Sequence, residues 1–283
     1  MPKVSLIICV HGDREPLQRL LDQSVDCYDE LLVIHDGPDF DNVGDLVSQF
    51  GGRFIERPRA FSQEPHLPFA FGQAANDWIL RFDSDEFPST GLRNWLIQFR
   101  KTPRVNDDVS GYYCIWPAWN GRRVITKHWP SKRLFLFHRN RVKLIGLCEN
   151  GPQPDTKPCK LNLRLSHEPT GQSHGLRNIF GKKRTAQARK NIAHALLGSP
   201  KEHPRWRYES DDWPRGWKEV KEHPILTGLW RLLIWPPRQA LAMILVGDIP
   251  WPSVFTHAGI FHATICVEYC RQRRRSRREG KVV

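Results

Sequence analysis

The stretch VSLIICVHGDREPLQRLLDQS (4–24) predicts the first strand and helix of a parallel sheet. Residues 4–10 form a continuous run that is mostly β-branched or aliphatic, which is typical of a strand buried on both faces. Residues 14–24 read as a helix, with Asp13 as its expected N-cap and Glu15 and Pro16 in its first turn. A buried strand followed at once by a helix indicates an α/β fold.

The same alternation continues through the first 87 residues. Three further short apolar runs read as strands: LLVIH (31–35), RFIE (53–56) and WILRF (78–82). Helices are expected between them at 41–52, which ends on a Gly pair, and at 69–77. Because strand–helix–strand units connect with right-handed crossovers, we expect a Rossmann-like, mostly parallel sheet flanked by helices.

The middle of the chain has a different texture. Strands are expected at 110–119, 123–129 and 133–139, with turns at Asn120-Gly121 and Pro130-Ser131, and a further strand at 161–171 runs into His167. These segments predict an antiparallel extension of the sheet, which we expect to cover the ligand-binding site described next.

Polar clusters follow three of the predicted parallel strands. His11 comes after the first strand, Asp36 after the second, and Asp83, Ser84 and Asp85 after the fourth. Ligands of such sheets bind at the carboxyl ends of the strands, so we expect these residues to meet at one edge. An acid after the second strand can accept hydrogen bonds from a base or ribose, although Asp36-Gly37 is also a common turn pair.

The stretch FDSDEF (82–87) places three carboxylates in four positions. Two short carboxylates one residue apart can bind one hard divalent cation, and a cation would relieve their mutual repulsion. The alternative is a solvated turn before a helix at 91–100 capped by Ser89 or Thr90. The sequence contains neither a G-x-G-x-x-G after its first strand nor a P-loop motif, which argues against a dinucleotide dehydrogenase or a P-loop enzyme.

Charge divides the chain into two parts. Residues 1–100 hold nine Lys and Arg against sixteen Asp and Glu, whereas residues 101–283 hold 34 against 14. An acidic first third argues against a uniformly basic nucleic-acid-binding protein. The seven cysteines form no CxxC pair, and the N-terminal apolar run is only about seven residues long. Both features predict a cytoplasmic protein without a cleaved leader.

Residues 175–283 predict a basic helical region. A helix is expected at 178–198, six tryptophans lie between 200 and 251, and residues 271–281 read RQRRRSRREGK. No segment offers about 20 uninterrupted apolar residues. Interleaved Trp and Arg predict a region lying on an anionic membrane surface; the alternative is a Trp-rich core with a disordered basic tail. We therefore expect a catalytic domain at 1–174, with a nucleotide-sugar half at 1–100 and an acceptor half at 101–174, followed by this region.

The ordered set VSLIICVHGDREPLQRLLDQS, DELLVIHDG (29–37) and AANDWILRFDSDE (74–86) resembles family-2 glycosyltransferases of the GT-A fold. KRLFLFHR (132–139) and GLCENG (146–151) resemble a subgroup that builds lipopolysaccharide core or similar envelope glycans. The chain departs from that subgroup at Cys148, where the subgroup has His, and at 67–69, where the family often has a polar run.

The resemblance implies a role for each matching residue. Asp36 would contact the nucleotide, and Asp83 and Asp85 would bind the Mg²⁺ or Mn²⁺ that bridges the donor diphosphate. Family-2 enzymes invert the anomeric centre, so a carboxylate base is expected; Glu149 is nominated, with Glu86 as the alternative base or a supporting residue. Arg57 and His167 are possible supporting residues, for which the ordinary readings are surface arginine and strand end.

The sequence and this resemblance thus predict an inverting glycosyltransferase that moves a sugar from a nucleotide-diphosphate donor to an envelope or lipid-linked glycan at the inner face of the cytoplasmic membrane. The donor that we expect is a UDP-hexose. One rival is a metal-dependent nucleotidyltransferase or nucleotide-sugar hydrolase. A second, disfavoured by the acidic first hundred residues, is a nucleic-acid-binding protein.

Overall fold

The computed structural model describes residues 1–103, 105–106, 108–117, 124, 132–144, 151–169, 183–197, 215–250 and 252–279. The chain divides into two compact units. The first comprises Met1–Pro117 and Pro130–Thr170, and the second comprises Ala118–Trp129 and Gly171–Val283.

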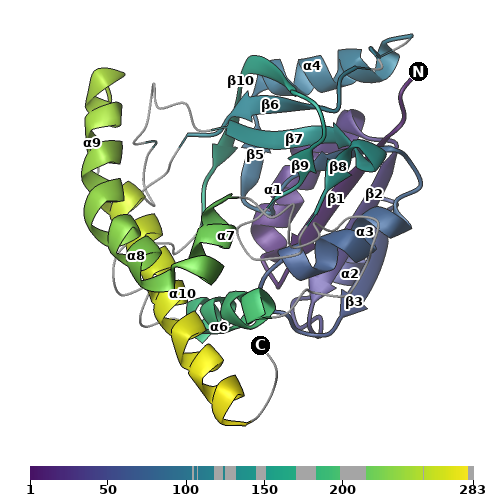
Figure 1. The fold of residues 1–283 in the computed structure, drawn as a ribbon. Coiled ribbons are helices and arrows are strands. Elements are labelled where there is room, and N and C mark those ends of the chain that lie inside the picture. The colour runs from purple at the N-terminus through teal and green to yellow at the C-terminus, as the bar shows by residue number, and fades with distance from the viewer. Residues whose placement is uncertain are drawn as a thin grey trace. The chain divides into compact units, whose positions relative to one another are not determined.

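The first unit is built on an eight-stranded sheet with the order β3-β2-β1-β4-β7-β6-β10-β5 (Figure 1). The strands β1, β2, β3 and β4 pair in parallel, whereas β7 runs antiparallel to both β4 and β6. The eight strands are β1 Val4–Val10, β2 Glu30–Asp36, β3 Arg53–Arg57, β4 Trp78–Arg81, β5 Glu86–Pro88, β6 Gly111–Ile115, β7 Lys132–His138 and β10 Cys159–His167. Two short strands, β8 Val142–Lys143 and β9 Gln153–Pro154, form a separate antiparallel pair. The predicted α/β fold, with its parallel half and antiparallel extension, is confirmed.

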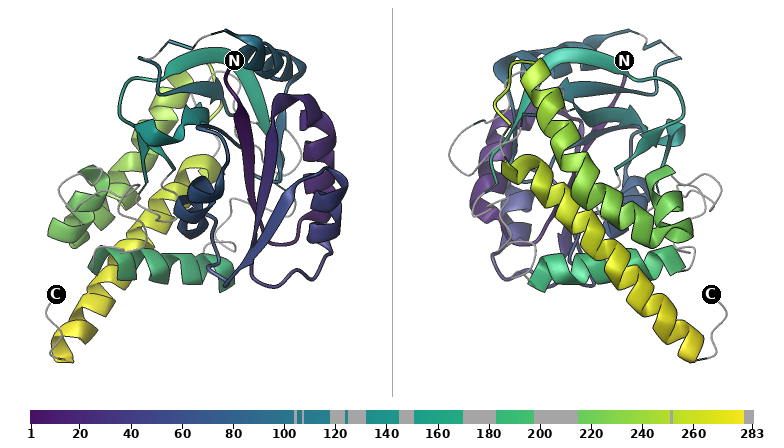
Figure 2. Two further views of the ribbon diagram at one scale, coloured as in Figure 1. Left: turned by 90° about the vertical axis from the view of Figure 1, so that its right-hand side faces the viewer. Right: turned by 60° about the vertical axis from the view of Figure 1, so that its left-hand side comes forward.

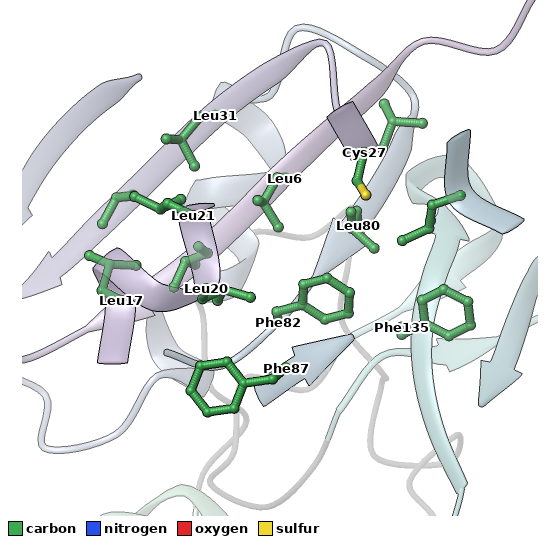
Figure 3. Packing of buried hydrophobic residues seen from close by; sticks show 14 of the residues in the cluster. Leu6, Leu17, Leu20, Leu21, Cys27, Leu31, Leu80, Phe82, Phe87 and Phe135 are labelled. Atoms are coloured by element: carbon green, nitrogen blue, oxygen red, sulfur yellow. The ribbon is translucent and has the colours of Figure 1, made fainter. Parts of the chain in front are cut away.

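Helices cover both faces of the parallel half. Figure 2 shows α1 (Arg14–Ser24) and α2 (Val43–Gln49) on one side and α3 (Leu67–Gln73) on the other. Successive side chains of a strand point to opposite faces of the sheet, so β1 contributes to the packing on both faces. Its even-numbered residues belong to a hydrophobic cluster that also contains the leucines of α1, whereas Ile7 is buried outside that cluster. Figure 3 shows the cluster side, where Leu6 and Leu20 lie near Phe82.

Local signals place the helices well, with two exceptions. Ser89 caps α4 (Thr90–Lys101) by accepting a hydrogen bond from the Leu92 amide at 3.3 Å. Asp13 precedes α1 as expected, but its backbone is left-handed (φ 61°) and its side chain makes no cap hydrogen bond. The helix expected at 69–77 lies at Leu67–Gln73, because Pro68 fits the first turn of a helix that begins two residues earlier.

Two predicted elements had other outcomes. The strand expected at 123–129 lies almost wholly outside the described residues. The acids of 82–87 were expected in a loop, yet Glu86 opens β5, which pairs antiparallel with β10 so that Glu86 faces His167. Sequence pattern did not indicate β5, because a strand of three residues has no readable periodicity.

The second unit is helical. Its described helices are α6 (Lys183–Leu197), α7 (Arg215–Glu222), α8 (Pro224–Leu229), a π-helical turn at Trp230–Ile234, α9 (Trp235–Leu245) and α10 (Pro252–Arg278). The basic residues that the sequence suggested were a terminal tail are thus helical as far as Arg278. Among the described residues, no helix is both long enough and apolar enough to span a bilayer.

One ion pair fastens the start of β1 to the end of α4. The carboxylate of Asp29 accepts a hydrogen bond from the Val4 amide at 2.8 Å and another from Nε of Arg100 at 3.1 Å. Burial alone would raise the pKa of Asp29, but these two donors outweigh it and lower the pKa below its ordinary value.

We therefore predict a pH-dependent effect of Asp29→Asn. A lowered pKa stabilises the fold above the unfolded-state value and ceases to do so as pH falls through the folded-state value. The variant should lose stability at neutral pH, and its difference from the wild type should shrink as the pH falls below the ordinary pKa range of an aspartate. Urea unfolding at neutral pH and at an acidic pH below that range measures this, with the exposed Asp22→Asn as control. A pH-independent difference would contradict the prediction.

Candidate active site

Loops at the carboxyl ends of β1, β2 and β4 meet at one edge of the sheet, as the sequence predicts. The Gly12 amide donates to Nε2 of His35 at 3.1 Å, which joins the first two loops. The Ser84 hydroxyl donates to the carboxylate of Asp13 at 3.3 Å, which joins the first loop to the acidic one. Instead of capping α1, the side chain of Asp13 therefore contacts the loop that contains Asp83 and Asp85.

Two arginines, one buried and one partly buried, balance the acidic loop. Nη2 of Arg133, on β7, lies 2.8 Å from Asp83, and Nε of Arg133 lies 3.3 Å from Glu86. Nη2 of Arg81, on β4, lies 3.8 Å from Asp83. The sequence suggested that a bound cation would relieve repulsion among these acids. In the structure, the guanidinium groups of Arg133 and Arg81 already provide part of the countercharge.

Two neighbouring acids of this loop, Asp83 and Glu86, have pKa values shifted in opposite directions. Burial alone would raise the pKa of Asp83, but Arg133 and then Arg81 outweigh it and lower the pKa to about 2. Burial dominates at Glu86, whose side chain is fully enclosed, and raises its pKa to about 7 despite the attraction of Arg133. Glu86 also accepts a hydrogen bond from the Asp83 amide at 2.9 Å, so it shapes the loop from within.

Asp85 faces a different partner. Nε2 of His167, at the end of β10, lies 3.5 Å from its carboxylate. The imidazole of His167 stacks on Trp116, with ring centroids 4.5 Å apart. Burial alone would lower the pKa of His167, but the hydrogen bond and charge of Asp85 outweigh it and raise the pKa. The structure thus places His167 beside the acidic loop, the less favoured of the two sequence readings.

Asp36 is buried and its carboxylate organises the chain after β3. It accepts hydrogen bonds from the Ala60 amide at 2.5 Å, the Phe61 amide at 3.0 Å and Nε2 of His66 at 2.9 Å. Nε of Arg59 lies 3.5 Å from it. The predicted contact between Asp36 and a nucleotide stays a prediction, and the observed role of this carboxylate is to hold residues 59–66.

His11 and Arg57 each carry a buried nitrogen without a hydrogen-bond partner among the described residues, namely Nδ1 of His11 and Nη1 of Arg57. The ring of His11 meets the edge of Phe40 at 5.0 Å, and the guanidinium of Arg57 lies 4.3 Å above Phe69. Buried polar atoms are normally satisfied, so these two nitrogens are among the exceptions in the described part of the chain. Glu149, the nominated base, lies outside the described residues.

The acid pair suits a divalent cation that is shared with a substrate. No group of three or more His, Cys, Asp or Glu side chains in the described part of the chain forms a complete metal cluster. Mg²⁺ does not need one, because it is commonly bound by one or two carboxylates and completed by substrate phosphates and water. Asp83 and Asp85 provide those two carboxylates, with Asp83 ionised far below neutral pH.

The sequence reading missed Arg81, Arg133, Trp116 and Gln63, whose side chain hydrogen-bonds Asp83. One signal was available: an arginine inside the apolar run WILRF, directly before the acids, has to be buried beside a countercharge. The sequence carries no such signal for Arg133 and Trp116, since these two residues meet the acidic loop only because of the order of the strands in the sheet.

No known sequence family and no curated protein matches the chain, but solved structures do. Glucosyl-3-phosphoglycerate synthase from Mycobacterium tuberculosis with Mn²⁺ and UDP-glucose has a TM-score of 0.44 at 13% identity, over 74% of this chain and 81% of that one. The same enzyme with phosphoglyceric acid also bound gives 0.33 at 15% identity, and there the match covers 41% of this chain and 44% of that one. S. aureus TarS 1-349 gives 0.38 at 12% identity, over 99% of this chain and 92% of that one.

Proposed function

We propose that the protein is an inverting glycosyltransferase that takes a hexose from a UDP-sugar. One observation carries the proposal: a preorganised acidic loop lies where three parallel strands end, with two ionisable acids, Asp83 and Asp85, one residue apart. Ligands of α/β sheets bind at this edge. The ordered resemblance of residues 4–86 to family-2 glycosyltransferases supports the same conclusion.

In the proposed mechanism, Asp83 and Asp85 would hold a Mg²⁺ or Mn²⁺ ion, which would supply countercharge to the diphosphate leaving group. Arg133 fixes Asp83 in its ionised form, and His167 orients Asp85 from the opposite side. Ser84 links this loop to the one that begins at His11. These contacts preorganise the loop before substrate binds, which lowers the cost of reaching the transition state.

We assign the role of general base, which deprotonates the acceptor hydroxyl, to Glu149. Glu86 is the less suitable candidate because its carboxylate is enclosed and already engaged with Arg133 and the Asp83 amide. We therefore propose Glu86 as a positioning residue of the acidic loop.

For the acceptor we propose a lipopolysaccharide-core or similar envelope glycan, including lipid-linked forms, at the cytoplasmic face of the inner membrane. The resemblance of 132–139 and 146–151 to enzymes of that class supports the acceptor. Exposed apolar side chains and arginines of the second unit support membrane attachment.

A thermal-shift panel tests the donor. UDP-sugars, other nucleotide sugars and free nucleotides are added with and without Mn²⁺. A ligand at one hundred times its Kd stabilises the native state by about 2.7 kcal/mol, so the correct donor should raise Tm by several degrees only when Mn²⁺ is present. If no nucleotide sugar raises Tm, the proposal is contradicted. A separate assay of the reaction products tests the rival enzyme classes: pyrophosphate release would favour a nucleotidyltransferase, and hydrolysis without an acceptor would favour a nucleotide-sugar hydrolase.

A further inference from the structure

A groove of about 630 Å³ runs through the second unit between α10 and the segment formed by α8 and the π-helical turn. These helices lie side by side in Figures 1 and 2. Ile225, Leu229 and Leu232 line one wall, and Val267 lines the other. All four side chains are strongly exposed, with Ile225 at 70% and Val267 at 59%. Apolar side chains gathered this way on a surface mark a binding site.

Two glycines allow the helices that form the groove to approach closely. A Cβ on Gly228 would lie 3.3 Å from the Cβ of Cys266 on α10, and a Cβ on Gly259 would lie 2.6 Å from the backbone oxygen of Arg231. The second distance is too short for any side chain. The base of the groove is therefore fixed by backbone packing.

The other end of the groove is cationic. Arg271, Arg274, Arg275 and Arg278 line it, and they occupy one face of α10 because they recur at intervals of three and four residues. Arg271 forms an ion pair with Glu268 at 2.8 Å. Three exposed guanidinium groups thus remain directed at the groove, and guanidinium is well suited to bind phosphate oxygens.

Apolar and cationic ends in one groove require an amphiphilic ligand. From Ala263 to Arg278, α10 contributes about 22 Å of wall at 1.5 Å per residue. Among the residues that the structure describes, no aromatic side chain lines the groove. Aliphatic walls that end in arginines match an acyl chain attached to a phosphate.

We propose that this groove binds an anionic membrane phospholipid, with an acyl chain along α8 and α10 and its phosphate on Arg274, Arg275 and Arg278. The proposal rests on the membrane attachment proposed above and goes further by naming the surface and the ligand. Leu241, Leu245 and Ile249 lie outside the groove and are also exposed, which fits a unit that meets the acyl region of a bilayer.

The test is co-flotation of the full-length protein with vesicles, without any sugar donor, so its outcome is independent of catalysis. One set contains phosphatidylcholine alone, and the other phosphatidylglycerol and phosphatidylcholine in equal parts. Binding should require phosphatidylglycerol. Arg275→Glu should weaken it about tenfold or more, because each arginine near an anionic surface contributes about fivefold. Arg277→Glu, an equal charge change outside the groove lining, should weaken it less.

Photo-crosslinking locates the acyl chain. Phosphatidylglycerol with a diazirine on its acyl chain should label Leu229, Leu232 or Val267. Val267→Asp should abolish this labelling, whereas Leu241→Asp, a substitution of similar exposure outside the groove, should retain it. The proposal is overturned by equal losses for Arg275→Glu and Arg277→Glu, by labelling confined to α9, or by an oligonucleotide that binds with the same dependence on Arg275.

Discussion

Replacing Arg133 with methionine should lower the free energy of unfolding by about 2 kcal/mol, since it leaves the enclosed carboxylate of Glu86 and the partly buried one of Asp83 without their main partner. Arg133 is 18% exposed and lies 2.8 Å from Asp83 and 3.3 Å from Glu86. Without it, the arginine that remains beside these two carboxylates among the described residues is Arg81, whose nearest guanidinium nitrogen is 3.8 Å from Asp83. Urea unfolding, followed by circular dichroism, measures the loss.

Two further variants make this prediction specific. Arg53→Met removes a half-exposed arginine 3.1 Å from Glu30 and should cost less than about 1 kcal/mol. Adding Glu86→Gln to Arg133→Met should recover part of the loss, because it removes one of the carboxylates left without a partner. An Arg133→Met protein as stable as the wild type would show that the acidic loop is not held together by this guanidinium.

The Asp85→Asn variant should lose sugar transfer by a factor on the order of a thousand, since metal stabilisation of a leaving group is worth several kcal/mol. Asparagine has nearly the shape of aspartate, so the fold should be retained. The only ion pair that the substitution weakens joins Asp85 to His167 at 3.5 Å, within the described residues. Radiolabelled sugar transfer over a series of Mn²⁺ concentrations measures both the rate and the metal requirement.

Asp22→Asn, on the exposed surface of α1, is the matched control and should leave activity unchanged. Transfer by Asp85→Asn at the wild-type rate and Mn²⁺ dependence would remove Asp85 from the metal site. A variant that fails to unfold cooperatively would instead assign Asp85 a structural role through His167.

The parallel half of the sheet could be predicted from sequence because its information is local. The apolar runs of β1, β2 and β4 are bounded by turns and helices, and their ends fix where His11, Asp36 and Asp83 lie. Each of these three residues lies at or just after the carboxyl end of a parallel strand, and such ends lie at the same edge of the sheet. The Ser89 cap was equally readable, since its hydroxyl acts within its own first turn.

The environment of the acids could not be predicted, because it comes from strands that are distant in sequence. Which face of β7 carries Arg133 depends on its register with β4 and β6, and register is a tertiary property. The position of His167 opposite Glu86 likewise depends on the pairing of β10 with β5. Asp13 misled local reasoning, since a good N-cap residue serves the neighbouring loop instead.

Arg133 follows Asp83 by 50 positions, and this separation has a consequence for synthesis of the protein. At 5–20 residues per second, the acidic loop leaves the ribosome roughly 3 to 10 s before its main countercharge. The first hundred residues hold all three acids but neither Arg133 nor His167. A nascent chain of that length therefore exposes a repelling acidic segment, and the catalytic edge is completed only after β7 and β10 have been translated and have joined the sheet.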